Sequence, residues 1–250
     1  DSFLVNNLKC LKFNEDMDWV KLYKPKDLNE WFMNPHMVNA YFSPTYNESE
    51  NIALFLKSID ELNLSADLLI VDDNSPDKTW QIIQDCSKNK KNINLIIRDK
   101  KEGLDTAHKI AYKYCIDNNY EFLITLDADL THDPKKIPEF INELEKNYFV
   151  IGSRYMKGGT TDMKGWRLFL SYFGNKFFKF IFNIDCDEYT SSFRGFSLKK
   201  LKDFDLNNIK SKGYSFFMET IYLINKKNIY IKQIPISARQ RYGGKSKIER

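Results

Sequence analysis

LLIVDDNS at residues 68–75 and FLITLDAD at residues 122–129 follow the same pattern, in which a short apolar run ends in paired carboxylates. Runs of this length and composition are typical of strands that are buried on both faces of a parallel sheet. The acids then lie at the carboxyl ends of two strands, where open α/β sheets bind their ligands. Four carboxylates on one rim repel one another, so we expect a divalent cation and a nucleotide to share this edge.

Strands and helices alternate outward from these two stretches. The pattern predicts strands at 38–43, 68–71, 93–97, 122–126, 148–151 and 229–236. It predicts helices at 48–62, from Ser75-Pro76-Asp77 onward, and at 104–118, 134–146, 164–182 and 215–225. The alternation indicates an α/β fold with a mostly parallel central sheet flanked by helices, which spans residues 37–250. Residues 1–36 show no clear strand, and we expect an N-terminal extension of unknown role with one or two short helices.

The composition restricts the function less than the motifs do. The 250 residues include 38 basic and 34 acidic side chains, and the net charge of +4 does not argue for a nucleic-acid partner. The four cysteines have no Cys-x-x-Cys spacing and are typical of free thiols rather than of a zinc site. No apolar stretch reaches the roughly 18 residues of a membrane span. The sequence does not begin with Met, and membrane helices in a longer chain remain an open alternative.

The two acidic motifs predict different contacts. Asp127 and Asp129 are two residues apart in an extended segment, so both carboxylates face the same way and can ligate Mg²⁺ or Mn²⁺ together with diphosphate oxygens and water. Such a metal neutralises a departing diphosphate. Asp72 and Asp73 can accept hydrogen bonds from a base or a ribose. The alternatives are exposed loop acids for the first motif and, for the second, a helix N-cap, since Ser75 and Asp77 both cap well.

Other candidate ligand contacts follow the predicted strands. Pro44 is expected to end the first strand, and Tyr46 can pack on a nucleobase, although the same segment also fits an ordinary turn into a helix. The guanidinium groups of Arg154, Arg167 and Arg194 suit phosphate oxygens. For Arg167 a solvated helix face is the alternative.

The predicted helix at 164–182 has two distinct faces. It carries four basic residues and no acid. Arg167, Ser171 and Asn175 recur every four residues and form one polar stripe. The opposite side is aromatic, and it either packs in the core or lies in a membrane interface. The aromatic residues of that side are Trp166, Phe169, Phe173, Phe177 and Phe180.

Taken together, these motifs resemble the dolichyl-phosphate (polyprenyl-phosphate) mannosyltransferase group of family 2 glycosyltransferases, which have the GT-A fold. The matching segments run in order along about 200 residues, and the ordered set is more specific than any one motif. They are Pro44–Glu48, Val71–Asp77, Gly103-Leu104, Asp127–Pro134, Gly152–Tyr155, Gly158-Gly159, Trp166-Arg167 with Ser171 and Asn175, Thr190–Arg194, Lys212–Tyr214 with Glu219, and Arg241 with Gly244–Lys247.

The resemblance implies a role for each matched residue. The metal would be held by Asp127 and Asp129. The acceptor phosphate would be gripped by Arg154, Arg167 and Ser171. Arg241 and Lys247, on a mobile C-terminal loop, would close over the phosphates and complete the catalytic set. The nucleotide sugar would be held by Pro44, Tyr46, Glu48, Asp72, Asp73, Asp127 and Arg241.

The chain departs from the family pattern at three positions. Asp105 stands where the family usually has the second glycine of Gly-Leu-Gly, which leaves the shape of the nucleotide loop open. Thr131 and Phe217 stand where glutamine is common, and the first of these leaves a third metal contact open.

The resemblance also implies the reaction. An inverting transferase would move mannose from GDP-mannose to a polyprenyl phosphate, with Mg²⁺ or Mn²⁺ bound. UDP-glucose and UDP-linked amino sugars remain alternative donors. The phosphate monoester is ionised at neutral pH, because its second pKa is about 6, so no strong general base is needed. The enzyme is expected on the cytoplasmic face of a membrane, held there by its aromatic helix, by small partner subunits or by a segment outside this sequence.

Other classes fit the sequence less well. The stretch Asp127–Thr131 matches the Asp-x-Asp-x-Thr pattern of aspartate-nucleophile phosphatases. That pattern normally opens its domain and has a second acidic pair downstream, whereas here strand–helix units come first and Asp72-Asp73 lies upstream. A receiver domain and a protein that only binds nucleotide are further alternatives. The Gly-x-Gly-x-x-Gly of nicotinamide enzymes and the Gln-x-x-Arg-Trp of polysaccharide synthases are both absent.

Overall fold

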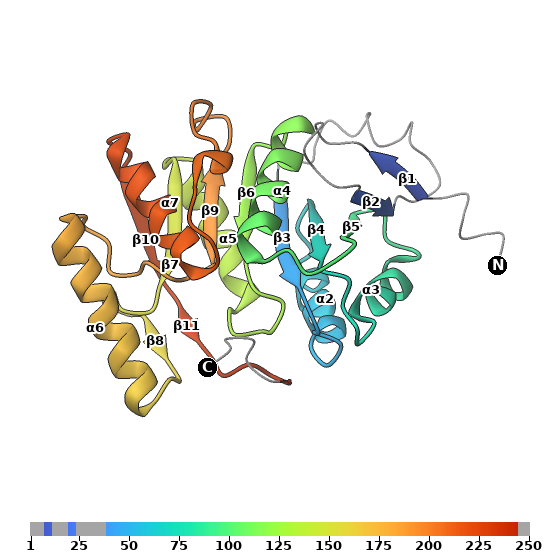
Figure 1. Ribbon diagram of the computed structural model, residues 1–250, viewed down its shortest axis with the longest axis horizontal. Helices are drawn as coiled ribbons and strands as arrows, with labels where there is room; N and C mark the ends of the chain where they lie inside the picture. Colours follow the sequence, from blue (N-terminus) through green and yellow to red (C-terminus); the bar gives the residue numbers. More distant parts are fainter. Residues whose placement is uncertain (1–7, 12–19, 24–38, 245–250) are drawn as a thin grey trace.

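The computed structural model describes residues 8–11, 20–23 and 39–244, and within them a nine-stranded sheet forms the centre of the molecule (Figure 1). The strand order is β1-β2-β5-β4-β3-β6-β9-β7-β10. These strands are β1 Leu8–Leu11, β2 Val20–Tyr23, β3 Asn39–Thr45, β4 Ala66–Asp72, β5 Ile93–Ile97, β6 Phe122–Thr125, β7 Phe149–Ser153, β9 Arg194–Ser197 and β10 Ile231–Pro235. A small second sheet pairs β8 (Thr160–Thr161) with β11 (Ser237–Ala238).

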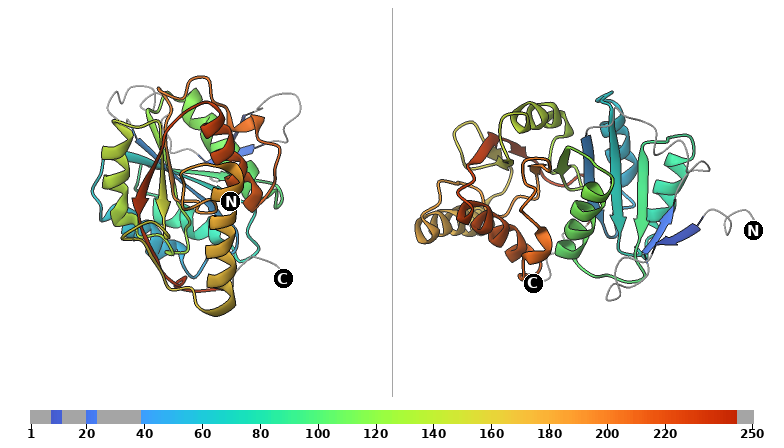
Figure 2. Two further views of the ribbon diagram at one scale, coloured as in Figure 1. Left: turned by 90° about the vertical axis from the view of Figure 1, so that its left-hand side faces the viewer. Right: turned by 90° about the horizontal axis from the view of Figure 1, so that it is seen from above.

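Helices cover both faces of the large sheet, so the fold has three layers (Figure 2). The helices α2, α3 and α5 enclose one hydrophobic core with the sheet, and α4 and α7 enclose the other. The helices are α2 Ile52–Asp60, α3 Thr79–Ser87, α4 Leu104–Asp117, α5 Ile137–Leu144, α6 Gly165–Phe182 and α7 Tyr214–Lys226, with short 3-10 turns η2 Pro134–Lys136 and η3 Leu206–Asn208. The predicted α/β fold with a mostly parallel sheet is therefore confirmed.

The strand directions place the acidic motifs on one rim. The strands β5, β4, β3 and β6 are parallel, with Thr45 opposite Asp72 and Phe42 opposite Thr125. The strand β9, which the sequence pattern did not predict, runs antiparallel between β6 and β7 and leaves those two strands parallel to each other. The carboxyl ends of β3, β4, β6 and β7 consequently open on the same side, and the loops that follow them carry the candidate residues.

Two local predictions were wrong. The N-terminal extension contains the strands β1 and β2, which form an antiparallel pair and extend the sheet beyond β5. Four-residue strands are too short for their alternation to stand out in the sequence. Pro44 lies inside β3 and does not end it, since it is paired in register with Val71. Pairing of β3 with β6 stops at Phe42, so the missing N–H of Pro44 costs the sheet no hydrogen bond.

The aromatic face of α6 is exposed, so its residues do not pack in the core, and contact with a membrane interface stays a prediction. Figure 1 shows α6 at the margin of the molecule, at the opposite end from β1. Trp166 is 69% exposed and Phe180 is 84% exposed, whereas Phe178 and Phe182 pack against the core. None of the described helices is long and apolar enough to cross a membrane. The exposed apolar residues of α6 are Trp166, Phe169, Leu170, Tyr172, Phe173, Phe177, Phe180 and Ile181.

Candidate functional site

The acidic pair lies directly after β6, at the carboxyl rim. Oδ1 of Asp129 accepts hydrogen bonds from the backbone N–H and the hydroxyl of Thr131, at 3.1 and 2.7 Å. Thr131, which stands where the family often has glutamine, therefore orients the carboxylate of Asp129. Burial of Asp127 and the nearby charges of Asp129 and Glu48 raise the pKa of Asp127, while His132 opposes this shift. The two neighbouring carboxylates therefore disfavour a further negative charge at Asp127.

These acids fit a hard divalent cation only when other ligands join them. Carboxylate oxygens are the donors that Mg²⁺ and Mn²⁺ prefer. The crowding that raises the pKa of Asp127 also favours an added cation. Within the part of the chain that the structure describes, no cluster of three or more His, Cys, Asp or Glu side chains can hold a metal by itself. The remaining ligands would have to come from a bound substrate and from water.

A strap formed by residues 239–244 crosses the same rim. Nη2 of Arg241 donates to both carboxylate oxygens of Glu48, at 2.9 and 2.7 Å, and its Nη1 lies 3.9 Å from Oδ2 of Asp129. The backbone N–H of Gly243 donates to Asn51, whose amide also donates to Glu48. Three predicted site residues that are far apart in the sequence, Glu48, Asp129 and Arg241, therefore lie close together. Lys247, which was predicted for the same loop as Arg241, lies outside the described residues.

Asp72 and Asp73 have different surroundings. Asp72 is fully buried, and its two oxygens accept hydrogen bonds from Thr45 and from both the N–H and the hydroxyl of Ser75. It fixes the loop between β4 and α3, and a contact between Asp72 and a nucleotide stays a prediction. Asp73 accepts from the N–H groups of residues 102 and 103 and forms an ion pair with buried Arg98.

The other side of the predicted nucleotide site is formed by Tyr46 and the loop before α4. The ammonium group of Lys101 lies 4.5 Å from the centre of the Tyr46 ring. Asp105, the carboxylate that replaces a family glycine, is buried and accepts a hydrogen bond from the N–H of Gly213 at 3.0 Å. It joins the start of α4 to the start of α7.

Arg154 is held by a buried acid that the sequence analysis did not single out. After β7, its Nε and Nη2 donate to the two oxygens of Glu188, each at 2.7 Å, and Nη2 also donates to Thr190. Burial disfavours the charged guanidinium, but Glu188 outweighs burial and the pKa of Arg154 is raised, with a smaller contribution from Asp127. Arg154 is therefore a fixed cation close to the acidic pair. The only sequence signal for Glu188 is its place just before the matched segment Thr190–Arg194.

The predicted polar stripe of α6 divides into three environments. Arg167 is exposed. Ser171 accepts a hydrogen bond at 2.6 Å from the hydroxyl of Tyr155, the residue next to Arg154. Asn175 is buried and accepts from the N–H of Tyr189, so it anchors the helix to the loop that carries Glu188. Tyr155 thus links Arg154 and Ser171, which the sequence predicts as acceptor residues, and Arg167 lies one helical turn from Ser171.

Arg194 does not reach the rim. It is almost completely buried in β9 and donates to the backbone oxygens of Tyr189, Ser191 and Phe217. Burial lowers its pKa to about 9. The guanidinium therefore ties β9 and its preceding loop to α7, and the sequence interpretation of Arg194 as a phosphate ligand was wrong.

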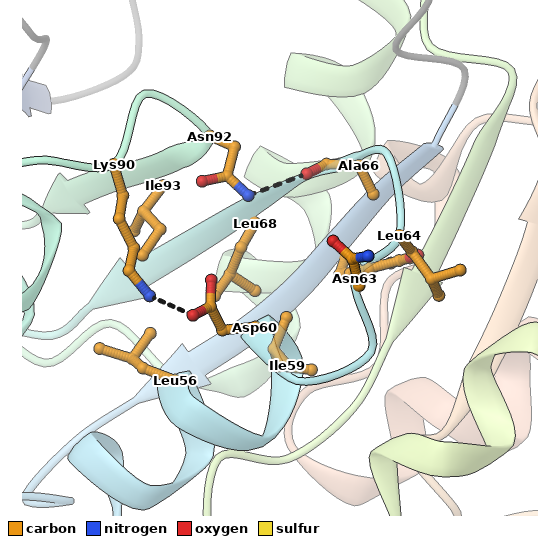
Figure 3. A pocket seen from close by; sticks show the side chains of 11 residues that line it. Leu56, Ile59, Asp60, Asn63, Leu64, Ala66, Leu68, Lys90, Asn92 and Ile93 are labelled. Carbon is orange, nitrogen blue, oxygen red and sulfur yellow. Dashed lines mark hydrogen bonds and ion pairs between the residues drawn. The ribbon is translucent and has the colours of Figure 1, made fainter.

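A cavity of about 130 Å³ lies at the other end of the sheet (Figure 3). It is lined by the amino ends of β4 and β5 and by the end of α2, with the ion pair of Lys90 and Asp60 beside it at 2.8 Å. None of its lining residues belongs to the candidate site.

Comparisons with known proteins show the family of this chain. Residues 42–204 match the family described as Glycosyl transferase family 2. The chain is 29% identical over 208 residues to an undecaprenyl-phosphate mannosyltransferase of Micrococcus luteus, which covers 82% of this chain and 85% of that protein. It is also 28% identical over 208 residues to a polyprenol monophosphomannose synthase of Mycolicibacterium smegmatis, and the match covers 82% of this chain and 78% of that protein.

The fold is similar to that of a solved mannosyltransferase from Pyrobaculum calidifontis, in complex with GDP-Man and Mn²⁺. The TM-score is 0.55 and the sequences are 15% identical, over 86% of this chain and 63% of that chain. At this identity the similarity concerns the fold alone.

Proposed function

Because the chain belongs to glycosyl transferase family 2 and has the GT-A fold, we propose that it transfers mannose from GDP-mannose to a polyprenyl phosphate with a divalent metal bound. The observation that carries the proposal is the meeting of Glu48, Asp129 and Arg241 at the carboxyl rim. The substrate classes are those named for the two bacterial relatives, and GDP-Man with Mn²⁺ is the pair bound by the structural neighbour.

The nucleotide half of the reaction follows from the residues around the strap. Tyr46 offers a ring face to the base or ribose, and Asp73 holds the loop at 102–103 beside it. Arg241 lies between Glu48 and Asp129, where its guanidinium can meet the negative charge of a diphosphate. Asp127 and Asp129 would hold Mg²⁺ or Mn²⁺, which when bound neutralises the charge of the leaving diphosphate.

The attack of the acceptor phosphate on the sugar depends on the charge of that phosphate and on how the protein positions it. An oxygen of the lipid phosphate forms a bond to the anomeric carbon while the bond from that carbon to the diphosphate oxygen breaks, which releases GDP and inverts the centre. The phosphate is already ionised at neutral pH, since its second pKa is about 6, and needs no general base. Arg154, Arg167 and Ser171 hold it in line, so catalysis rests on positioning and charge stabilisation.

Transfer of radiolabelled sugar to a short polyprenyl phosphate tests this function. With GDP-mannose and Mn²⁺ we expect labelled lipid product, and with EDTA we expect the signal to fall to background. UDP-glucose, assayed in parallel, is expected to give little product. Product from UDP-glucose alone would reject GDP-mannose as donor, and equal product with and without EDTA would reject the metal.

The lipid acceptor places the enzyme at a membrane, and we propose that α6 docks on its cytoplasmic face. The exposed aromatic residues of α6 lie beside basic ones on a helix without acids, which suits an interface with anionic lipids. Replacing Phe173 and Phe177 by Ser should weaken binding to anionic phospholipid vesicles by at least about tenfold, because two apolar contacts are lost. Vesicle co-sedimentation measures this, with Tyr230→Ser as the exposed control. Equal sedimentation of the double variant and the control would contradict docking through this face.

A further inference from the structure

The acceptor residues Arg154 and Ser171 are connected by a network whose other members have no assigned role. Glu188 accepts hydrogen bonds from Arg154, and Thr190 contacts both of these residues. Tyr155 contacts both Arg154 and Ser171. The centre of the Tyr155 ring is 5.1 Å from the Arg154 guanidinium carbon, and the Tyr155 hydroxyl donates to Ser171. The network therefore joins the loop after β7, the helix α6 and the loop before β9.

Glu188 controls how Arg154 is presented. Its side chain is fully buried, and it accepts two parallel hydrogen bonds from the guanidinium as well as two from Thr190. A forked pair of this kind fixes the plane of the guanidinium. The two bonds use Nε and Nη2, and no hydrogen bond joins Nη1 of Arg154 to another described residue. Arg154 can thus offer Nη1 to an anion without rotating.

Glu188 also compensates the charge of Arg154. A buried carboxylate and its guanidinium partner are together close to neutral, so this pair contributes direction more than net positive charge. The exposed guanidinium of Arg167 then supplies the uncompensated charge. With Arg154 supplying direction and Arg167 supplying charge, the site binds the lipid phosphate without holding the product too tightly. A site with several unpaired cations would also retain the phosphodiester product and slow its release.

Tyr155 plays the matching part for Ser171. When the Tyr155 hydroxyl donates to Oγ of Ser171, the serine proton is free to point elsewhere, and a phosphate oxygen is a suitable acceptor. The ring of Tyr155 meanwhile packs under the guanidinium of Arg154. One side chain therefore sets the positions of both groups.

We propose that Glu188 and Tyr155 are positioning residues of the acceptor site, which orient Arg154 and Ser171 toward the phosphate monoester of a polyprenyl lipid. This inference rests on the proposed function, since it takes the lipid phosphate as the acceptor. Neither residue touches the reacting atoms, and each acts through its partner.

Titration with farnesyl phosphate, in the absence of any nucleotide sugar, tests the inference in the full chain. We expect Glu188→Gln to weaken binding by about tenfold, since it loses one charged hydrogen bond of the fork, and Glu188→Asp to recover part of the loss. Tyr155→Phe keeps the ring and should weaken binding by about threefold to tenfold. The control is Glu143→Gln, which removes a carboxylate from the ion pair with Lys232 outside the site.

A split between the two substrates separates positioning from general damage. The KM for the lipid should rise in both variants, while the KM for GDP-mannose should stay within about twofold of that of the unmodified protein. If Glu188→Gln fails to fold, Tyr155→Phe still decides, because it removes a single hydroxyl from a half-buried residue. Unchanged lipid affinity in Tyr155→Phe would overturn the inference and leave the proposed function standing. No binding of farnesyl phosphate by the unmodified protein would overturn both.

Discussion

Asp127→Asn is expected to lower kcat by about 10³-fold while leaving the protein folded, because the substitution removes a charge that the proposed reaction uses and relieves the repulsion among the neighbouring acids. Asp127 is crowded by Asp129 and Glu48, and this crowding contributes to its raised pKa. Asparagine has nearly the same size, and it relieves the repulsion between the acids. Thermal stability should therefore be unchanged or slightly higher, which is the usual direction for a group kept for function.

The control for this variant lies on the same loop. Asp133 caps the turn η2 by accepting from the N–H of Lys135 and contacts Arg239 on the strap. Asp133→Asn keeps an oxygen for the cap, so kcat should stay within about threefold of that of the unmodified enzyme. Transfer to a short polyprenyl phosphate measures both variants, and thermal denaturation confirms their folding. Equal losses in the two variants would mean that the loop, and not the carboxylate pair, is responsible.

Arg194→Met is expected to have the largest effect on stability. The guanidinium satisfies the backbone oxygens of Tyr189, Ser191 and Phe217 inside the core. Methionine fits among the neighbouring aromatic rings but donates no hydrogen bond, so three buried carbonyl oxygens each lose one hydrogen bond. Each such loss costs about 1–3 kcal/mol, and the free energy of unfolding should fall by several kcal/mol. For a chain of this size that corresponds to a melting temperature lower by roughly 10 °C.

An exposed arginine gives the matched comparison for the stability experiment. Arg239 pairs with Asp133 at 3.1 Å, and its side chain is 64% exposed. Arg239→Met should change the melting temperature by about 2 °C at most, since surface ion pairs contribute little. Calorimetry or circular dichroism at increasing temperature distinguishes the two variants. Similar melting temperatures for both would show that the three carbonyl contacts contribute little to stability.

Where a strand has a long apolar run, the sequence predicts it well. The predicted strand at 93–97 coincides with β5, and the helix predicted from 104 begins at the same residue as α4. The strand β9 was missed because RGFS has no apolar run and contains a buried charge. The strands β1 and β2 were missed because they are only four residues long. All three strands depend on pairing with strands elsewhere in the chain, which a local sequence pattern does not show.

The candidate site shows the same limit for side chains. Strand ends are visible in the sequence, and the parallel strands β4 and β6 do end on the same side of the sheet, as the positions of Asp73, Asp127 and Asp129 predict. The motifs do not show how each oxygen is used, and Asp72 proved to be a loop-fixing acid for this reason. A charged residue in a sequence is usually predicted to face solvent or to bind a ligand. The buried, structural roles of Arg194 and Glu188 could therefore not be foreseen.

The antiparallel strand β9 also has a consequence for the newly made chain. The strands β5, β4, β3 and β6 are neighbours in that order. They can therefore pair with one another as soon as residue 125 has been synthesised, before any later strand exists. The described neighbours of β7 are β9 and β10, which both come later in the chain. Until Arg194–Ser197 emerge, β6 presents an open edge and β7 has no place in the sheet. This interval is when the nascent polypeptide is most exposed to aggregation, and when a chaperone would be of most use to it.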